Sequence, residues 1–199
     1  MKKLIWFTTA AILLLIFIVP AILALGLKLI PGEDQPSYNS DQRLSIYLTR
    51  DITQKFVSQE ANLSAIGTSI RNPNLKNKKD IILTLFDSKM NVLRTAVING
   101  QNIQDGDFVK FVFDPIPDSA NQIYFFTLAS PEAGPEETIE VFYTPSAPSW
   151  IEQYTYDNTI YPGGLPIVLY FKPTSKITVI KEIYSNLFSK LLPLNFHKS

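Results

Sequence analysis

The sequence of 199 residues contains no cysteine and a single histidine, His197. Without cysteine the chain forms no disulfide and offers no thiolate to a metal ion. This histidine lies close to the end of the sequence, where we expect frayed chain and no rigid element to hold the Ser–His or Cys–His pair of nucleophilic catalysis, so we expect a protein that is not an enzyme. We also expect no cofactor, because no strand signal is followed by the glycine-rich loops that bind nucleotides.

Clustered basic residues are equally scarce. The formal net charge is zero, and residues 101–160 contain one lysine against ten aspartates and glutamates. A nucleic-acid-binding surface needs lysine and arginine gathered on one face. We therefore expect no nucleic-acid partner, and we interpret the acidic stretch as a solvated surface.

One long stretch has no charge at all. Residues 4–27 are uncharged and follow Met1-Lys2-Lys3, and about 20 apolar residues suffice for a helix to cross a bilayer. We predict a transmembrane anchor at residues 1–30, with the lipid bilayer as its partner. The flanking lysines predict a cytoplasmic N-terminus and an extracytoplasmic domain, single-pass in the cell membrane. A cleaved signal peptide is the alternative, although its apolar region spans only about 7–15 residues.

The remainder is typical of β structure. Residues 31–43 are rich in Pro, Gly, Asp and Ser and predict a linker. Strand signals separated by turns follow at 52–57, 63–70, 81–86, 92–98, 108–113, 123–128, 139–143, 153–160 and 165–171. They predict an all-β domain at residues 44–173, an antiparallel two-sheet sandwich resembling a jelly roll. Its expected core is Phe56, Ile66, Leu83, Leu85, Val109, Phe111, Phe113, Phe126, Val141 and Leu169.

The final segment, residues 174–199, changes to helical periodicity. A helix at 177–192 would place one apolar stripe opposite its polar residues, and the stripe consists of Ile180, Ile183, Tyr184, Leu187 and Leu191. Its three charges argue against a second membrane crossing. This amphipathic helix has three candidate partners, which are the sandwich itself, the membrane surface and a helix of another protein.

Four aromatic residues form the strongest candidate for ligand binding: Trp150, Tyr154, Tyr156 and Tyr161. Tyr154 and Tyr156 are two positions apart and share one face of an extended strand. Flat rings with a polar edge suit a sugar ring or a protein surface. The alternative is that these rings fill the core of the sandwich.

Three aspartates, Asp105, Asp107 and Asp114, form the densest group of carboxylates. Carboxylate and backbone oxygens are the ligands that Ca²⁺ prefers, so this group is a candidate calcium site. The alternative is a turn with solvated carboxylates around Asp105-Gly106-Asp107.

Residues 50–171 contain a series of strand and turn motifs, namely Gln54-Lys55-Phe56, Asn62-Leu63-Ser64-Ala65-Ile66, Leu83-Thr84-Leu85-Phe86-Asp87, Val92-Leu93-Arg94, Ile103-Gln104-Asp105-Gly106, Phe111-Val112-Phe113-Asp114-Pro115-Ile116 and Tyr124-Phe125-Phe126-Thr127-Leu128. In this order they resemble jelly-roll modules similar to carbohydrate-binding modules. The resemblance extends to ectodomains that follow the first membrane helix of uncharacterised bacterial envelope proteins, some of them glycosyltransferase-like.

These observations predict a membrane-anchored, extracytoplasmic binding module without catalytic activity, whose ligand is a glycan or another component of the cell envelope. The alternative is a structural or assembly protein whose sandwich and C-terminal helix contact another membrane protein.

Overall fold

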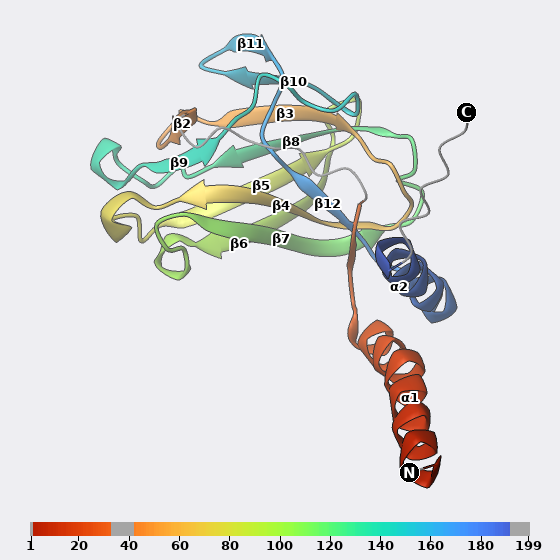
Figure 1. Ribbon diagram of the computed structural model, residues 1–199. Coiled ribbons are helices and arrows are strands. Elements are labelled where there is room, and N and C mark those ends of the chain that lie inside the picture. The colour runs from red at the N-terminus through yellow and green to blue at the C-terminus, as the bar shows by residue number, and fades with distance from the viewer. Residues whose placement is uncertain (1, 33–41, 192–199) are drawn as a thin grey trace, which may run out of the picture. The chain divides into compact units, whose positions relative to one another are not determined.

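The computed structural model describes residues 2–32 and 42–191 of the chain (Figure 1). The chain forms two compact units. One is Pro31–Lys172, and the other combines Met1–Ile30 with Pro173–Ser199. The second unit contains the two α-helices, α1 (Lys2–Gly26) and α2 (Lys176–Leu191).

The unit Pro31–Lys172 is built from short strands. They are β1 (Ile30–Pro31), β2 (Arg43–Ile46), β3 (Ile52–Val57), β4 (Leu63–Arg71), β5 (Asp80–Phe86), β6 (Val92–Asn99), β7 (Asp107–Ile116), β8 (Ile123–Ala129), β9 (Ile139–Phe142), β10 (Ile151–Tyr156), β11 (Thr159–Pro162) and β12 (Val168–Phe171). Three 3₁₀ turns lie between them, at Pro73–Leu75, Gly100–Asn102 and Pro135–Glu137.

The strands form two antiparallel sheets of six strands each. In one sheet β2 pairs with β9, β9 with the end of β4, and β4 with β7, while β12 lies along the first half of β4. In the other sheet the order is β11-β10-β3-β8-β5-β6. The pairs β3–β8, β4–β7 and β5–β6 are nested in the sequence, as in a jelly roll. The predicted all-β, two-sheet sandwich is confirmed.

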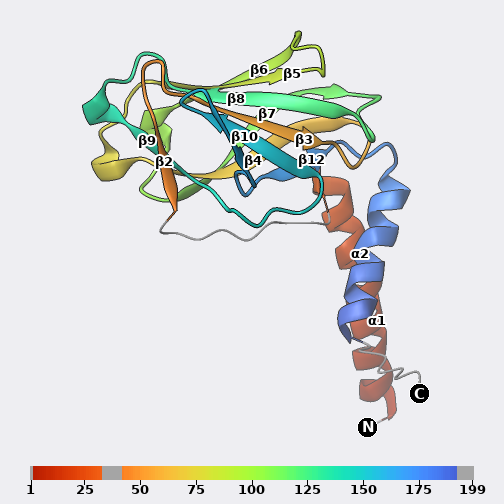
Figure 2. The same ribbon diagram turned by 90° about the horizontal axis from the view of Figure 1, so that it is seen from above.

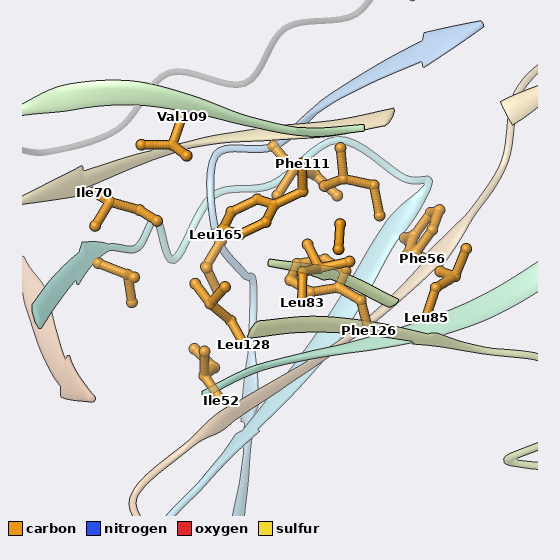
Figure 3. Packing of buried hydrophobic residues seen from close by; sticks show 14 of the residues in the cluster. Ile52, Phe56, Ile70, Leu83, Leu85, Val109, Phe111, Phe126, Leu128 and Leu165 are labelled. Carbon is orange, nitrogen blue, oxygen red and sulfur yellow. The ribbon is translucent and has the colours of Figure 1, made fainter. Parts of the chain in front are cut away.

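The core lies between the two sheets (Figure 3). Inward-facing side chains alternate along each strand, so that Ile52, Gln54 and Phe56 of β3 are buried while the residues between them are partly exposed. Phe111 of β7 and Phe126 of β8 are fully buried among Leu83, Leu85 and Leu128. Each residue that we predicted for the core is buried.

One predicted strand was wrong. Residues 153–160 form the hairpin β10–β11, in which Tyr156 pairs with Thr159 across the two-residue turn Asp157-Asn158. Both turn residues have positive φ angles, of 49° and 60°, which is the conformation that tight hairpin turns require. The strand β2 was not predicted at all.

The predicted linker, residues 31–43, falls mostly outside the described residues. Its two described ends belong to the sandwich unit. The N–H of Gly32 donates to the carbonyl of Leu169 at 2.8 Å, and β2 begins at Arg43.

The helix α1 is apolar on all sides, and its segment Ile5–Leu23 is long and apolar enough to cross a membrane. Its large side chains are exposed, including Trp6 and Phe7. A helix that is hydrophobic all round needs an apolar surrounding. That α1 crosses a membrane, and the direction in which it does so, stay predictions.

The helix α2 begins one residue before the predicted start and runs beside α1 (Figure 2). The Nζ of Lys176 donates to the carbonyl of Leu27 at 2.5 Å, and the hydroxyl of Tyr184 donates to the carbonyl of Phe17. The sequence predicted the helix but did not predict α1 as its neighbour.

Candidate ligand-binding site

The predicted aromatic residues occupy different environments. Trp150, Tyr154 and Tyr156 are only 7%, 4% and 9% exposed, whereas Tyr161 is 38% exposed. The cause is the register of β10, because Tyr154 lies opposite Gln54 and Tyr156 opposite Ile52, both of which face the core. Tyr154 and Tyr156 therefore share a face, as expected, and this face is the inner one.

Tyr154 joins the core to the surface of the β10–β11 hairpin. Its ring stacks on Tyr161 with centroids 5.3 Å apart and contacts Tyr143 at 5.9 Å. Burial raises the pKa of Tyr154 to about 12, with a smaller contribution from Tyr143. Of the four aromatic residues predicted to bind a ligand, Tyr161 is thus the one whose ring a ligand can reach from solvent.

The other two predicted aromatic residues, Tyr156 and Trp150, differ in the hydrogen bonding of their polar atoms. The hydroxyl of Tyr156 donates to the carbonyl of Ser45 at 2.8 Å, which connects β10 to β2. The indole Nε1 of Trp150 is buried without a hydrogen-bond partner in the described part of the chain.

The structure does not bring the three candidate calcium ligands together. Asp105 forms a two-point ion pair with Arg71, which lowers the pKa of the Asp105 carboxyl, and Asp107 accepts the N–H of Gln104 at 2.8 Å. Asp114 lies seven positions further along β7, or about 23 Å at a rise of about 3.3 Å per residue. Within residues 2–32 and 42–191 no cluster of three or more His, Cys, Asp or Glu could hold a metal ion.

A different site lies at one end of the sandwich, where two turns face each other. It is an open pocket of about 370 Å³, which we call the turn pocket, lined by Tyr47, Leu48, Thr49, Arg50, Asp51, Asp157 and Asn158. The first turn connects β2 to β3 and the second connects β10 to β11. Pairing between β3 and β10 brings the two turns together.

Each turn is fixed by its own backbone. In the first, the N–H of Tyr47 donates to the carbonyl of Arg50 at 3.1 Å and the N–H of Arg50 returns a bond of 2.8 Å. Leu48 has a φ of 49°, a conformation that costs free energy in a residue with a Cβ, and its N–H donates to the carbonyl of Ala133 at 3.1 Å. The second turn is the left-handed pair Asp157-Asn158. The walls of the pocket are therefore set by short, hydrogen-bonded turns.

Arg50 connects the two turns. Its Nε and Nη2 donate to the two carboxylate oxygens of Asp157 at 2.9 and 2.6 Å. Its guanidinium lies 5.7 Å from the ring centre of Tyr47 and 5.4 Å from that of Tyr156, within the range of cation–π attraction. The bonds to Asp157 are the main cause that holds the pKa of Arg50 above its ordinary value. Such a planar, two-point pair fixes the orientation of both side chains.

Asp51 adds a second carboxylate to the pocket. Desolvation by the pocket walls raises the pKa of Asp51 above its ordinary value, and the negative charge of Asp157 contributes to the same shift. The pocket therefore combines guanidinium and amide donors with carboxylate, hydroxyl and amide acceptors beside an aromatic ring. This combination can bind a small polar group with several hydroxyls.

Sequence reasoning did not find this site. Its members come from segments about a hundred residues apart, and none of them was among the predicted ligand-binding residues, although the ring of one of those, Tyr156, contacts Arg50. The pair Asp157-Asn158 was the available signal, because such residues favour a tight hairpin turn.

The chain is thus an all-β sandwich protein with an apolar N-terminal helix and a polar pocket between two turns. No family model matches it, and no curated protein matches it. Among solved structures it is similar to the enzymatically active domain of tailspike protein 4 from bacteriophage CBA120, with 15% identity and a TM-score of 0.33. That match covers 73% of this chain and 18% of the tailspike chain, so this chain spans less than a fifth of the tailspike's length.

A second solved structure, the D1-D2-D3 domains of the flagellar cap protein FliD from Escherichia coli, matches with 12% identity and a TM-score of 0.15. It covers 94% of this chain and 71% of the FliD chain. Likenesses at these TM-scores do not enter the functional argument.

Proposed function

We propose that the chain is a membrane-anchored, non-catalytic binding module whose turn pocket binds a glycan of the cell envelope outside the cytoplasmic membrane. The observation that supports this proposal is the fixed arrangement of Arg50, Asp157 and Tyr47 at the pocket wall. A site that is rigid before binding loses little conformational entropy when a ligand enters.

The chemistry of the pocket suits sugar hydroxyls. A hydroxyl group is both a donor and an acceptor, and the pocket presents guanidinium N–H groups close to the carboxylates of Asp51 and Asp157. Asn158 and Thr49 supply further groups of both kinds. Tyr47 in the pocket, and Tyr161 further along the β10–β11 hairpin, offer rings against which the C–H face of a sugar can pack.

The remaining parts of the proposal come from the sequence. The resemblance to carbohydrate-binding-module-like jelly rolls supports a glycan rather than another polar ligand. The lysines before α1 support an extracytoplasmic sandwich. We expect the sandwich to hold envelope polysaccharide close to the membrane surface.

The test is a glycan array probed with the full-length chain in lipid nanodiscs, with the variants Arg50→Lys and Asn158→Gly. Arg50→Lys keeps the positive charge but loses the two-point geometry, and Asn158→Gly removes an amide while keeping the left-handed turn. Losing one or two charge-assisted hydrogen bonds, about 1.5–3 kcal/mol each, should weaken binding at least tenfold.

A matched control is Asn121→Gly, since Asn121 is another exposed asparagine with a positive φ, of 58°. It lies in the turn before β8, outside the pocket, and should leave binding unchanged. A blank array, or binding that both pocket variants retain at full strength, contradicts the proposal.

A second candidate function is assembly with another membrane protein. It is favoured by apolar side chains on β6 and the turn before it, where Met90, Val92 and Val97 are 52%, 62% and 53% exposed. Large exposed apolar patches mark interaction surfaces. In this case Val97→Asp should abolish co-purification of the partner, whereas Arg50→Lys should leave co-purification intact.

A further inference from the structure

The contacts between α1 and α2 define how these two helices run. Lys176 at the start of α2 reaches Leu27, just past the end of α1, and Tyr184 reaches Phe17 two to three turns further in. The rings of Phe17 and Tyr184 also contact each other, with centroids 6.3 Å apart. The helices are therefore antiparallel, and the end of α1 that leads into the sandwich unit lies beside the start of α2.

The Lys176 contact has a clear electrostatic cause. The last carbonyl groups of a helix have no partner within the helix, and the helix dipole makes this end negative. The ammonium group of Lys176 donates to the carbonyl of Leu27, the residue directly after this end of α1, at 2.5 Å. It thereby ties the start of α2 to the C-terminal end of α1.

The Tyr184 contact lies next to a weak point of α1. Pro20 has no N–H, so the carbonyl of Ile16, four residues earlier, loses its helical partner. Tyr184 donates to the adjacent carbonyl, that of Phe17. In a bilayer, helices with proline are tolerated where groups of a neighbouring helix bind the exposed backbone. A tyrosine hydroxyl inside hydrocarbon equally needs an acceptor.

These contacts also give the depth of α2. The apolar span of α1 is Ile5–Leu23. At about 1.5 Å per residue, Leu27 lies about 6 Å outside this span, while Phe17 lies about 9 Å inside it. If α1 crosses the membrane, the start of α2 lies among the headgroups and Tyr184 lies within the hydrocarbon.

The length of α2 and the position of Lys181 agree with this depth. The helix has 16 residues, or about 24 Å, which is less than the roughly 30 Å of a hydrocarbon core. Lys181, which is exposed, lies about 7–8 Å below Lys176, so its long side chain can extend back to the headgroups.

We propose that α2 is a second membrane-embedded segment, which enters the bilayer from the side of the sandwich, packs antiparallel on α1 and ends without crossing. This inference rests on the proposed anchorage of α1. The competing locations are the membrane surface, the sandwich and a partner protein's helix. All three would leave Tyr184 outside the hydrocarbon or away from Phe17.

The absence of cysteine from the chain makes site-specific labelling straightforward. The full-length variant Ser185→Cys, carrying an environment-sensitive fluorophore, is placed in vesicles of phosphatidylcholine and phosphatidylglycerol whose acyl chains are brominated at different depths. Ser185 is exposed and adjoins Tyr184, so bromines within the acyl chains should quench the label more strongly than quenchers on the headgroups. Strongest quenching at the headgroups, or none, overturns the proposal.

Two control labels separate this proposal from the anchorage of α1. Leu13→Cys lies in the middle of α1 and should be quenched by bromines near the bilayer centre, whereas Leu75→Cys on the sandwich should not be quenched. A quenched Leu13→Cys with an unquenched Ser185→Cys overturns the location of α2 alone. An unquenched Leu13→Cys overturns the anchorage, and the embedded α2 with it.

Pairing of the helices is measured separately by disulfide formation. The double variant Phe17→Cys/Tyr184→Cys should form an intramolecular disulfide on mild oxidation. The control Ile5→Cys/Tyr184→Cys should not, because Ile5 lies about 18 Å further along α1. Equal yields for the two pairs, or no disulfide in the first, overturn the antiparallel packing.

Discussion

Gln54 provides the sharpest test of how the sandwich holds the turn pocket. Gln54 belongs to β3, which pairs with β10, and its side chain is fully buried. Its Nε2 donates to the carbonyls of Lys55 and Gln153 at 2.7 and 2.9 Å, and its Oε1 accepts the N–H of Leu165 at 3.0 Å. One side-chain amide thus forms hydrogen bonds with backbone groups of three segments. These bonds keep β10 in place, and β10 ends at the second turn of the pocket.

The variant Gln54→Leu keeps the volume but removes these bonds. It removes a partner from the buried N–H of Leu165 and from the partly buried carbonyl of Gln153, and each group left unsatisfied costs about 1–3 kcal/mol. We expect the free energy of unfolding to fall by about 2–6 kcal/mol. For a chain of this size this corresponds to a melting temperature lower by roughly 10 °C.

The measurement is thermal unfolding of the full-length chain in nanodiscs, followed by near-ultraviolet circular dichroism. Gln101→Leu, at an exposed position, is the matched control and should change the melting temperature little. A second variant, Gln54→Glu, has no N–H to offer to the two carbonyls. Its buried carboxyl would have a raised pKa, so its stability should be lost as the pH rises. Equal melting temperatures for Gln54→Leu and Gln101→Leu would refute the reasoning.

Three further predictions concern the pocket and the core. Because the folded state raises the pKa of Asp51, its charged form opposes folding; Asp51→Asn should raise the melting temperature at neutral pH, and the gain should shrink as the pH falls through the raised folded-state pKa and be absent below about 4. Tyr154, with a pKa of about 12, should stabilise the fold less as the pH rises from about 10 towards about 12. Tyr154→Phe should reduce this alkaline loss in a pH series of melting curves. Phe111→Ala should cost about 3–5 kcal/mol in urea unfolding, the usual cost of a large core cavity, whereas the exposed neighbour Val112→Ala should cost little.

The strands were predictable where burial alternates along them. Phe108 to Phe113 showed the period of two that places Val109 and Phe111 on the inner face, and both are buried. The hairpin β10–β11 was missed because the alternation of Tyr154 and Tyr156 continues into Ile160. Only the backbone conformation of Asp157-Asn158 interrupts it.

The candidate site was less predictable, since it depends on pairing between distant strands. The burial of Tyr154 and Tyr156 follows from their register with β3, which periodicity alone does not give. The position of Arg50 beside Asp157 depends on the same register. For α2, the stripe of Ile180 and Tyr184 predicted an apolar face, but such a pattern does not identify what covers it.

The nested pairing of the jelly roll has a consequence for how this chain acquires its structure. Arg43 of β2 and Glu140 of β9 form an ion pair although they are 97 residues apart. The first strands of the sandwich, β2 and β3, therefore have no neighbours until most of the domain has been synthesised. Folds dominated by such distant contacts form in milliseconds to seconds, far more slowly than helical bundles. During that interval β3, whose neighbours in the sheet are β8 and β10, has both edges unpaired, so the chain is at greatest risk of aggregation before these two strands are available.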